Sequence, residues 1–254
     1  MLAYRTMAIA PADLTAVILA AGTGSRLRPL TETTPKCLLD VGGKTILARQ
    51  LERVAEAGIP RAVIVTGHLA ALVEAHVATV PQAVEVRTAH NPEFATSGNC
   101  MSVLAAREQV ASRGIVLCDG DVVLTGDAMA RLAADAAPAA LLLDRETALA
   151  DEEMKAMLDA QGNVRRLAKP LPPAECAGES IGIQKVSGMA LPIFWATLES
   201  MREAGDVQGY YEDAFQRMIH AGVSFRTVPI GHHEWTEIDD QADLADARAR
   251  FAAR

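Results

Sequence analysis

The segment 16–36 reads AVILAAGTGSRLRPLTETTPK, and the interpretation of the whole chain starts from it. Its first six residues, 16–21, are apolar, which is typical of a buried strand in a parallel sheet covered by helices on both faces. Small residues follow at once, as they do where a backbone turns sharply and approaches another group closely. These small residues are Gly22, Thr23, Gly24 and Ser25.

Three cationic residues follow this turn, namely Arg26, Arg28 and Lys36. Backbone N–H groups and nearby guanidinium and ammonium groups favour phosphate, so the segment predicts a site for a nucleoside triphosphate. Two better-known phosphate loops are absent, because the chain has Leu27 where the dinucleotide motif needs a third glycine and lacks the GK[ST] of a P-loop. An ordinary strand-to-helix turn is the alternative, but such a turn has no need of cations at this spacing.

The composition limits the domain count and the classes of function. The chain has 254 residues and no composition shift or linker, which predicts a single domain over residues 14–254. We expect residues 1–13, which precede the first strand pattern, to form a mobile N-terminal extension. A formal charge of −8 argues against nucleic acid or a membrane surface as the main partner. Four separated cysteines without a CxxC pair predict reduced thiols, no zinc site and a cytoplasmic location. The sequence leaves a homo-oligomer open.

Apolar strand patterns alternate with helical ones along the first two thirds of the chain. Residues 46–57 and 101–110 have helical spacing, whereas residues 61–67 and 114–117 read as buried strands. This alternation predicts an α/β fold with a doubly wound, mostly parallel, Rossmann-like sheet, whose ligand crevice lies at the carboxyl ends of the strands. The pattern becomes irregular over residues 145–188, where we expect a small antiparallel insertion.

Asp119 and Asp121 follow the strand pattern of residues 114–117 as part of the tripeptide Asp-Gly-Asp. Carboxylates at this end of a strand face the ligand crevice, where an unpaired charge is costly without a metal or a cation. Hard divalent cations are commonly held by one or two carboxylates together with substrate phosphates. The pair therefore predicts a Mg²⁺ site, although Asp-Gly-Asp is also a common turn sequence.

The stretch LAAGTGSRLRPLTETTPKCLLDVGGKTIL resembles the signature of the nucleotidyltransferase family, which includes sugar-phosphate nucleotidyltransferases and MobA-like proteins. These enzymes join a nucleoside triphosphate to a phosphorylated sugar or alcohol and release pyrophosphate. The stretches SGNCMS, GESIGI, YYEDAF and WTEID are similar to those of the phosphocholine cytidylyltransferase-like branch. The resemblance implies an Mg²⁺-dependent transferase that takes a nucleoside triphosphate, CTP being favoured, and a small phosphorylated alcohol or amine similar to phosphocholine.

The resemblance also assigns roles to particular residues. It implies that Arg26, Lys36, Asp121 and Lys169 act in catalysis. For nucleotide binding it implies two groups, the glycine loop with its cations and a polar segment near the base. These are Leu19, Ala20, Ala21, Gly22, Thr23, Gly24, Ser25, Arg26 and Lys36, followed by Ser97, Gly98 and Asn99. For Ser97–Asn99 an ordinary surface loop with Asn99 as a helix N-cap is the alternative.

The same resemblance implies acceptor and metal residues in the second half of the chain. The implied acceptor site contains Lys169, Tyr210, Tyr211, Glu212 and Glu237. Asp239 and Glu237 would join Asp121 at the metal, because residues two apart on a strand share a face. Two of these residues also have a purely structural explanation. Lys169 could be a solvated residue before a turn, and Glu212 could complement the dipole of its helix.

Two other functions remain as alternatives to cytidylyl transfer. The first is a sugar-1-phosphate nucleotidylyltransferase that uses UTP, dTTP or GTP and shares the N-terminal motif. The second is a non-catalytic nucleotide-binding protein on the same fold, which the presence of the carboxylates and both cations disfavours. His232 and His233 are adjacent on an extended segment and are expected at the surface or the edge of the pocket.

Overall fold

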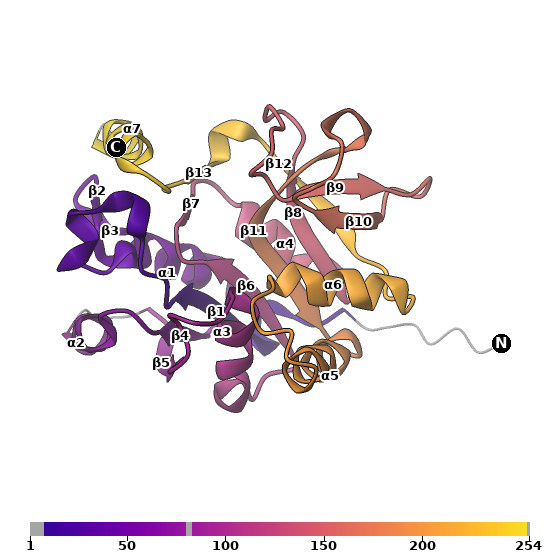
Figure 1. Ribbon diagram of the computed structural model, residues 1–254, viewed down its shortest axis with the longest axis horizontal. Helices are drawn as coiled ribbons and strands as arrows, with labels where there is room; N and C mark the ends of the chain where they lie inside the picture. Colours follow the sequence, from indigo (N-terminus) through magenta and orange to yellow (C-terminus); the bar gives the residue numbers. More distant parts are fainter. Residues whose placement is uncertain (1–7, 80–82, 253–254) are drawn as a thin grey trace.

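A nine-stranded sheet forms the centre of the part of the chain that the computed structural model describes, residues 8–79 and 83–252 (Figure 1). Four of its strands are parallel and adjacent in the order β6, β1, β4, β5. Their bounds are Leu14–Ala20 for β1, Arg61–Thr66 for β4, Glu85–His90 for β5 and Gly114–Asp119 for β6. The strand that leads into the glycine loop is therefore central in the sheet, with a parallel neighbour on each side.

Antiparallel strands complete the sheet beyond β6. The strand β11 (Gly178–Ser187) runs antiparallel to β6, to β8 (Ala139–Asp144) and to β9 (Lys155–Leu158). The strand β10 (Val164–Ala168) pairs with β9, and β12 (Arg226–Ile230) lies parallel to β8. The predicted irregular segment 145–188 contains β9, β10 and β11, all antiparallel to their neighbours in this part of the sheet. The strands β9 and β10 extend the sheet beside α6 (Figure 1).

Helices cover both faces of the sheet, which confirms the doubly wound, Rossmann-like architecture. One core contains side chains of α1 (Ile46–Glu56), α2 (Ala70–Thr79) and α4 (Ala128–Ala134). The other contains side chains of α3 (Asn99–Ala105), α5 (Ala190–Glu203) and α6 (Tyr211–His220). Alternate residues of β1 enter the two cores, Ile18 the first and Val17 the second, so its continuous apolar run is explained by burial on both faces.

Two short ribbons and the last helix close one end of the sheet. The strands β7 (Val122–Leu124) and β13 (Trp235–Glu237) pair with each other, as do β2 (Asp40–Val41) and β3 (Lys44–Thr45). The helix α7 (Gln241–Ala252) packs beside β2 through a small core that includes Val41, Leu244 and Phe251 (Figure 1). This packing holds the segment just before α7 next to the segment that follows β1.

Short 3₁₀ helices account for several turns, and element ends differ from the prediction by a few residues. The predicted helix 101–110 begins earlier, at Asn99, and ends at Ala105, and the 3₁₀ helix Arg107–Gln109 lies within the remaining predicted residues. The 3₁₀ helices are Pro11–Asp13, Ser25–Leu27, Leu30–Glu32, Lys36–Leu38, Arg107–Gln109, Pro173–Glu175 and His232–Glu234.

The N-terminal segment differs in part from the predicted mobile extension 1–13. Residues 1–7 lie outside the described residues, whereas Ile9 is only 7% exposed and joins the first core, and Pro11–Asp13 form a 3₁₀ helix. Ile9 therefore anchors this segment to the domain, because its apolar side chain finds a buried site, while Ala8, Ala10, Ala12 and Asp13 are exposed. Among the described residues, none of the helices has both the length and the apolar character needed to cross a bilayer.

Candidate active site

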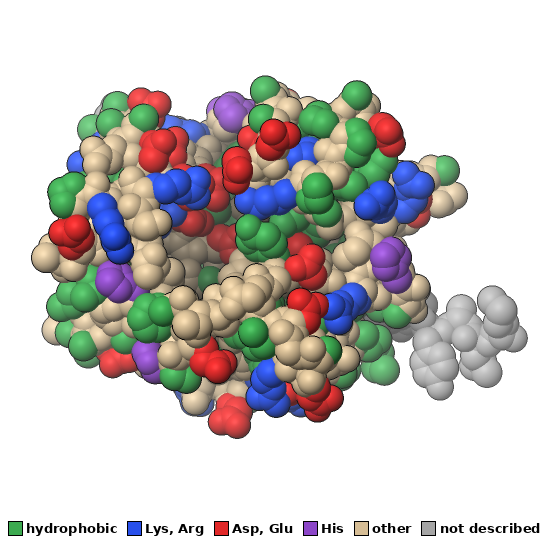
Figure 2. Space-filling model, viewed as in Figure 1, with side chains coloured by type: hydrophobic (Ala, Val, Ile, Leu, Met, Phe, Trp, Pro, Cys, Tyr) green, Lys and Arg blue, Asp and Glu red, His purple; other side chains and the backbone are tan. Residues whose placement is uncertain are grey.

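Two adjoining cavities open at the carboxyl ends of β1 and β6, where the fold predicts a ligand crevice. The larger has a volume of about 480 Å³ and the smaller about 220 Å³. Acidic and basic side chains gather around the hollow on this face of the molecule (Figure 2). Both cavities share Leu19, Gly22, Arg26, Gly120, Asp121 and Asp239 in their walls.

The glycine loop forms most of the smaller cavity. Gly24 has φ +59°, a left-handed conformation that favours glycine, and its carbonyl accepts a hydrogen bond from Thr31 Oγ1 at 2.8 Å. The carbonyl of Ala21 accepts from the backbone N–H of His68 at 3.0 Å. The predicted nucleotide-binding residues therefore converge on one wall. Those lining the smaller cavity are Leu19, Ala20, Gly22, Thr23, Gly24, Ser25, Arg26 and Lys36, and Ala21 lines the larger one.

Three carboxylates meet where the two cavities join. Asp121, Glu237 and Asp239 each offer an oxygen atom, and these atoms all lie within 4.8 Å of one another. The ladder between β7 and β13 opposes Glu237 to Val122, so Glu237 lies directly beside the Asp121 turn. Gln50 of α1 braces that turn, because its Nε2 donates to the carbonyls of Asp119 at 2.6 Å and Val122 at 2.9 Å.

Two predicted catalytic cations are ion-paired with this carboxylate cluster. Lys36 Nζ lies 2.8 Å from Asp121 Oδ2 and 3.0 Å from Asp239 Oδ1, and Arg26 lies 2.8 Å from Asp239 Oδ2. Burial alone would lower the pKa of Lys36, but the two ion pairs outweigh it and raise that pKa. Partial desolvation at the cavity edge and the neighbouring carboxylates Asp121 and Asp239 raise the pKa of Glu237 to about 8, although its side chain is exposed. Three carboxyl groups thus face two cations in this site.

The carboxylate cluster has the chemistry of a divalent cation site. Asp121 Oδ1 is buried and has no hydrogen-bond partner among the described residues. A buried acceptor without a donor is costly, and a hard cation with oxygen ligands satisfies it. Asp121, Glu237 and Asp239 thus fit Mg²⁺. Asp119 lies outside the cluster, since its Oδ2 accepts from Tyr211 Oη at 3.1 Å.

The polar segment Ser97, Gly98 and Asn99 lines the larger cavity, as predicted. The Asn99 side chain does not cap its own helix, because Gly98 occupies the N-cap position and makes no side-chain hydrogen bond. Instead Asn99 Oδ1 accepts from the backbone N–H of Tyr211 at 2.9 Å, and the Gly98 N–H donates to Val207 O at 2.7 Å. The segment thereby fixes the start of α6 relative to α3.

The far wall of the larger cavity contains the predicted acceptor residues, with one correction. Lys169, Tyr210 and Glu212 line it, and Lys169 Nζ lies 3.6 Å from Glu152 Oε2 and 5.3 Å from the centre of the Tyr210 ring. Tyr211 was predicted to bind substrate but is fully buried beneath the wall and is not among the lining residues. Its hydroxyl oxygen lies 3.1 Å from both Asp119 Oδ2 and Gln184 Oε1, so its role is to support the wall from below.

Several lining residues were not predicted from the sequence. Most of them come from the insertion and from β11, whose patterns reveal strands but not which side chains face a ligand. Phe94 and Ser102 come instead from the turn before α3 and from α3 itself. The sequence signal that could have pointed to this wall was Glu179, a carboxylate in a strand whose other residues, in the stretch GESIGI, are apolar or small. The residues missed are Phe94, Ser102, Glu152, Glu153, Met154, Glu179, Ser180, Ile181 and Gly182.

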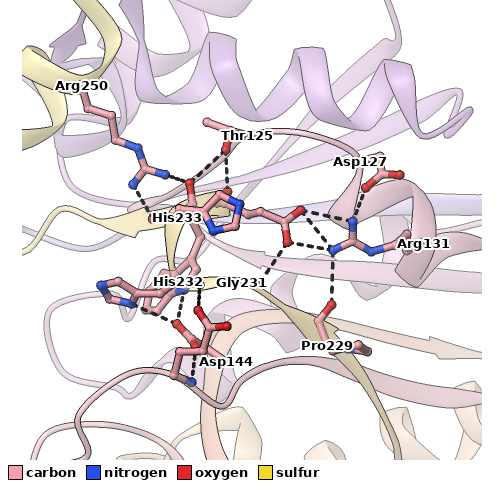
Figure 3. Close-up of polar contacts among 12 residues, drawn as sticks. Thr125, Asp127, Arg131, Asp144, Pro229, Gly231, His232, His233 and Arg250 are labelled. Atoms are coloured by element: carbon pink, nitrogen blue, oxygen red, sulfur yellow. Dashed lines mark hydrogen bonds and ion pairs between the residues drawn. The ribbon is translucent and has the colours of Figure 1, made fainter.

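Hydrogen bonds behind β13 anchor the strand that presents Glu237 (Figure 3). Asp144 is fully buried, and its Oδ2 accepts from Trp235 Nε1 at 2.7 Å and lies 3.1 Å from His232 Nδ1. Arg131 pairs with Glu234 (3.1 Å), whose carbonyl accepts from the backbone N–H of Thr125 at 2.6 Å. His232 is therefore a structural partner of Asp144 at the surface, in agreement with its predicted position.

The fold and the cavity define a nucleotidyltransferase-like site, and comparison with known proteins agrees. The chain belongs to the family of MobA-like NTP transferase domains, whose model matches residues 16–169. The inositol-1-phosphate CTP transferase from T. maritima has a similar structure, with a TM-score of 0.78 over 93% of this chain and 95% of that chain. At 20% sequence identity this likeness shows the fold alone.

Two curated relatives have names that refer to CMP or to cytidylyl transfer. The CMP-5'-(3-aminopropyl)phosphonate synthase of Streptomyces rubellomurinus is 32% identical over 246 residues, which cover 93% of this chain and 38% of that protein. The choline-phosphate cytidylyltransferase of Streptococcus pneumoniae is 35% identical over 104 residues, which cover 41% of this chain and 44% of that protein. The matches thus span less than half the length of each relative.

Proposed function

We propose that this protein transfers a nucleoside monophosphate, CMP from CTP, to a small phosphorylated alcohol or amine and releases pyrophosphate. One observation carries the proposal. The glycine loop, the cations Arg26 and Lys36, and the carboxylates Asp121, Glu237 and Asp239 all surround one pair of adjoining cavities. Family membership supports nucleotidyl transfer, and the names of the two curated relatives support CTP and a phosphorylated or phosphonate amine.

The reaction needs an oxygen nucleophile and a leaving group but no general base. A phosphate monoester has its second pKa near about 6, so its oxygen is already ionised at neutral pH. That oxygen forms a bond to the α-phosphorus of CTP, while the bond from the α-phosphorus to the bridging oxygen breaks and its electron pair leaves with pyrophosphate. The protein contributes positioning and neutralisation of charge.

The residues of the site divide this work. Lys36 and Arg26, which pair with Asp121 and Asp239, are placed to turn toward the triphosphate and to stabilise the departing pyrophosphate. The backbone N–H groups of the glycine loop bind phosphate oxygens. Lys169, at the far wall, binds the phosphate of the acceptor.

Mg²⁺ is the cofactor in this proposal, and Asp121, Glu237 and Asp239 hold it. When bound, Mg²⁺ neutralises phosphate charge and orients the phosphates for in-line attack. The support lies in the chemistry of the carboxylate cluster and in the buried Asp121 Oδ1, which lacks a donor among the described residues.

The alternative acceptor is a sugar 1-phosphate, with UTP, dTTP or GTP as the nucleotide, because the glycine loop is common to both types of enzyme. The deciding experiment measures pyrophosphate release with Mg²⁺, crossing CTP, UTP, GTP, ATP and dTTP with small phosphoalcohols, phosphoamines and sugar 1-phosphates. The proposal expects release with CTP and a small phosphorylated alcohol or amine. Release confined to a sugar 1-phosphate with UTP, dTTP or GTP would favour the alternative.

A further inference from the structure

The acceptor wall of the larger cavity is strongly acidic. Four glutamates line it, Glu152, Glu153, Glu179 and Glu212, together with the cation Lys169. The other cation among the described lining residues, Arg26, pairs with Asp239 on the nucleotide side. A wall intended only for an anionic acceptor has no need of four carboxylates, so the charge points to a cationic group in the ligand.

Glu212 carries the specific evidence within this wall. It is 4% exposed, it lines the cavity, and its Oε2 has no hydrogen-bond partner among the described residues. Leaving a buried carboxylate oxygen without a donor is costly, so such an atom marks the place where a ligand supplies one.

The position of Glu212 in the first turn of α6 does not explain this arrangement. The neighbouring Asp213 performs the capping, because its Oδ2 accepts from the backbone N–H of Tyr210 at 2.8 Å. The cap is therefore complete without Glu212 Oε2, and this oxygen has no partner among the described residues.

The same wall lacks the features that suit a quaternary ammonium group. Such a group has no N–H to donate and is held by aromatic faces. The aromatic residues among the described lining are Phe94 and Tyr210. Lys169 Nζ lies over the Tyr210 ring at 5.3 Å, and the Phe94 ring lies 6.3 Å from that of His68, beside the glycine loop. No aromatic enclosure surrounds Glu212 in the described part of the chain.

We infer that the acceptor is an ω-aminoalkyl phosphate or phosphonate with a primary ammonium group, and that Glu212 binds this ammonium. The inference rests on the proposed function and narrows its acceptor. The ammonium donates to Glu212 Oε2, and the phosphate or phosphonate end pairs with Lys169. Glu179, which is 7% exposed, lies in the same wall.

The test compares three acceptors that differ only at the end remote from phosphate: 2-aminoethyl phosphate, phosphocholine and 2-hydroxyethyl phosphate. With CTP and Mg²⁺, the wild-type protein should prefer 2-aminoethyl phosphate over both others in kcat/KM by at least about tenfold, as expected for a charged hydrogen bond. Equal or better use of phosphocholine or of 2-hydroxyethyl phosphate would overturn the inference while leaving the proposed function standing.

The variant Glu212→Gln keeps the size of the side chain and removes its charge. It should lower the ratio of kcat/KM for 2-aminoethyl phosphate to that for 2-hydroxyethyl phosphate at least about tenfold, mainly through a higher KM for the amine. Glu175→Gln is the matched control, because Glu175 is exposed in a 3₁₀ helix and does not line the cavity. An equal loss for both acceptors in Glu212→Gln would contradict a role in amine recognition.

Absence of turnover with every acceptor would refute the proposed function but would not decide the inference about the amine. Titration calorimetry tests that inference separately, because it measures binding without turnover. In the presence of Mg²⁺, 2-aminoethyl phosphate should bind the wild-type protein at least about ten times more tightly than 2-hydroxyethyl phosphate. The Glu212→Gln variant should abolish this difference while unfolding in urea at a similar midpoint. Equal binding of the two ligands by the wild-type protein would overturn the inference.

Discussion

The backbone N–H of Ile238 donates a hydrogen bond to the carbonyl oxygen of Asp121 at 3.1 Å. This bond continues the ladder between β7 and β13 and joins the two chain segments that carry the carboxylate cluster. Asp121 and its partners Glu237 and Asp239 are therefore held by backbone geometry rather than by side-chain contacts alone. A site fixed in this way needs little reorganisation when a cation and phosphates bind, which favours catalysis.

Replacing Asp121 tests the cluster directly. Asp121→Asn removes the carboxylate that pairs with Lys36 and offers a buried, unpartnered oxygen. We expect turnover to fall by about 10³-fold or more, because electrostatic stabilisation of the transferring phosphate is lost. Pyrophosphate release measures this, and circular dichroism should show an intact fold. The control Asp246→Asn, at an exposed position of α7, should keep full activity. Full Mg²⁺-dependent activity of Asp121→Asn would refute the metal assignment.

Replacing Lys36 should affect cation and nucleotide binding in opposite directions. In the absence of ligands Lys36 neutralises Asp121 and Asp239, so Lys36→Met leaves these carboxylates free for a divalent cation. Calorimetry should show Mn²⁺ alone binding at least as tightly as in the wild type, while CTP binds about 10- to 100-fold more weakly because a charged phosphate contact is lost.

The control for this experiment is Lys44→Met, since Lys44 pairs with Glu52 at an exposed position. It should leave the affinities for Mn²⁺ and CTP unchanged. Loss of Mn²⁺ binding in Lys36→Met would show that Lys36 supports the cation site rather than competing for it.

The parts of the site that follow from local sequence were predictable. The apolar run before Gly22 and the cations after it indicate a strand, a turn and a phosphate site, because all three lie within one short segment. Asp121 was predictable for the same reason, since it follows directly on the strand pattern of β6. Together with the strand and helix alternation, these signals were sufficient for the fold class.

The acceptor wall was less predictable, because its residues meet only through long-range packing. Glu179 lies in β11, and whether a strand residue faces a cavity or a core depends on the neighbouring strands. Tyr211 and Glu212 are adjacent in sequence, yet one is buried beneath the wall and the other lines the cavity. Only the helix packing of α6 decides between these positions.

The indole of Trp235 is expected to position the metal ligands on β13. Trp235→Phe leaves the buried Asp144 without its 2.7 Å donor, which should cost about 1 to 3 kcal/mol in the free energy of unfolding. Because Glu237 lies two residues further along the strand, the affinity for Mn²⁺ should fall as well. Urea unfolding and calorimetry measure the two effects.

Replacing the other tryptophan, Trp195, serves as the control, because it distinguishes a general loss of stability from a loss of positioning of the metal ligands. Trp195 lies in α5, in the core between the sheet and the helices α3, α5 and α6. Trp195→Phe should change the free energy of unfolding without changing the affinity for Mn²⁺. Unchanged Mn²⁺ affinity in Trp235→Phe would show that β13 is held well enough by its other contacts.

Buried glutamates should make the protein less stable as the pH rises. Burial raises the pKa of Glu179 and of Glu212 to about 7, from 4.5 in the unfolded chain. Between these values the folded state holds protons that the unfolded state has released, so this stabilisation is complete below 4.5 and disappears as the pH passes 7. Thermal unfolding should therefore show a midpoint that falls between about pH 5 and 8.

The double variant Glu179→Gln, Glu212→Gln provides the control for this pH dependence. Neither glutamine titrates, so the fall in the unfolding midpoint should be much smaller than in the wild type. An equally steep fall in the double variant would assign the pH dependence to other groups, such as Glu237, whose pKa is also raised by partial desolvation.

The most direct test of nucleotidyl transfer follows the α-phosphorus of CTP. The protein is incubated with Mg²⁺, 2-aminoethyl phosphate and CTP labelled at the α-phosphorus, and the products are separated and weighed by mass spectrometry. We predict that the label appears in a product containing CMP joined to the acceptor, in step with pyrophosphate release, and that Asp121→Asn forms none. Label recovered only as free CMP, or unconsumed CTP with every acceptor tested, would contradict the account.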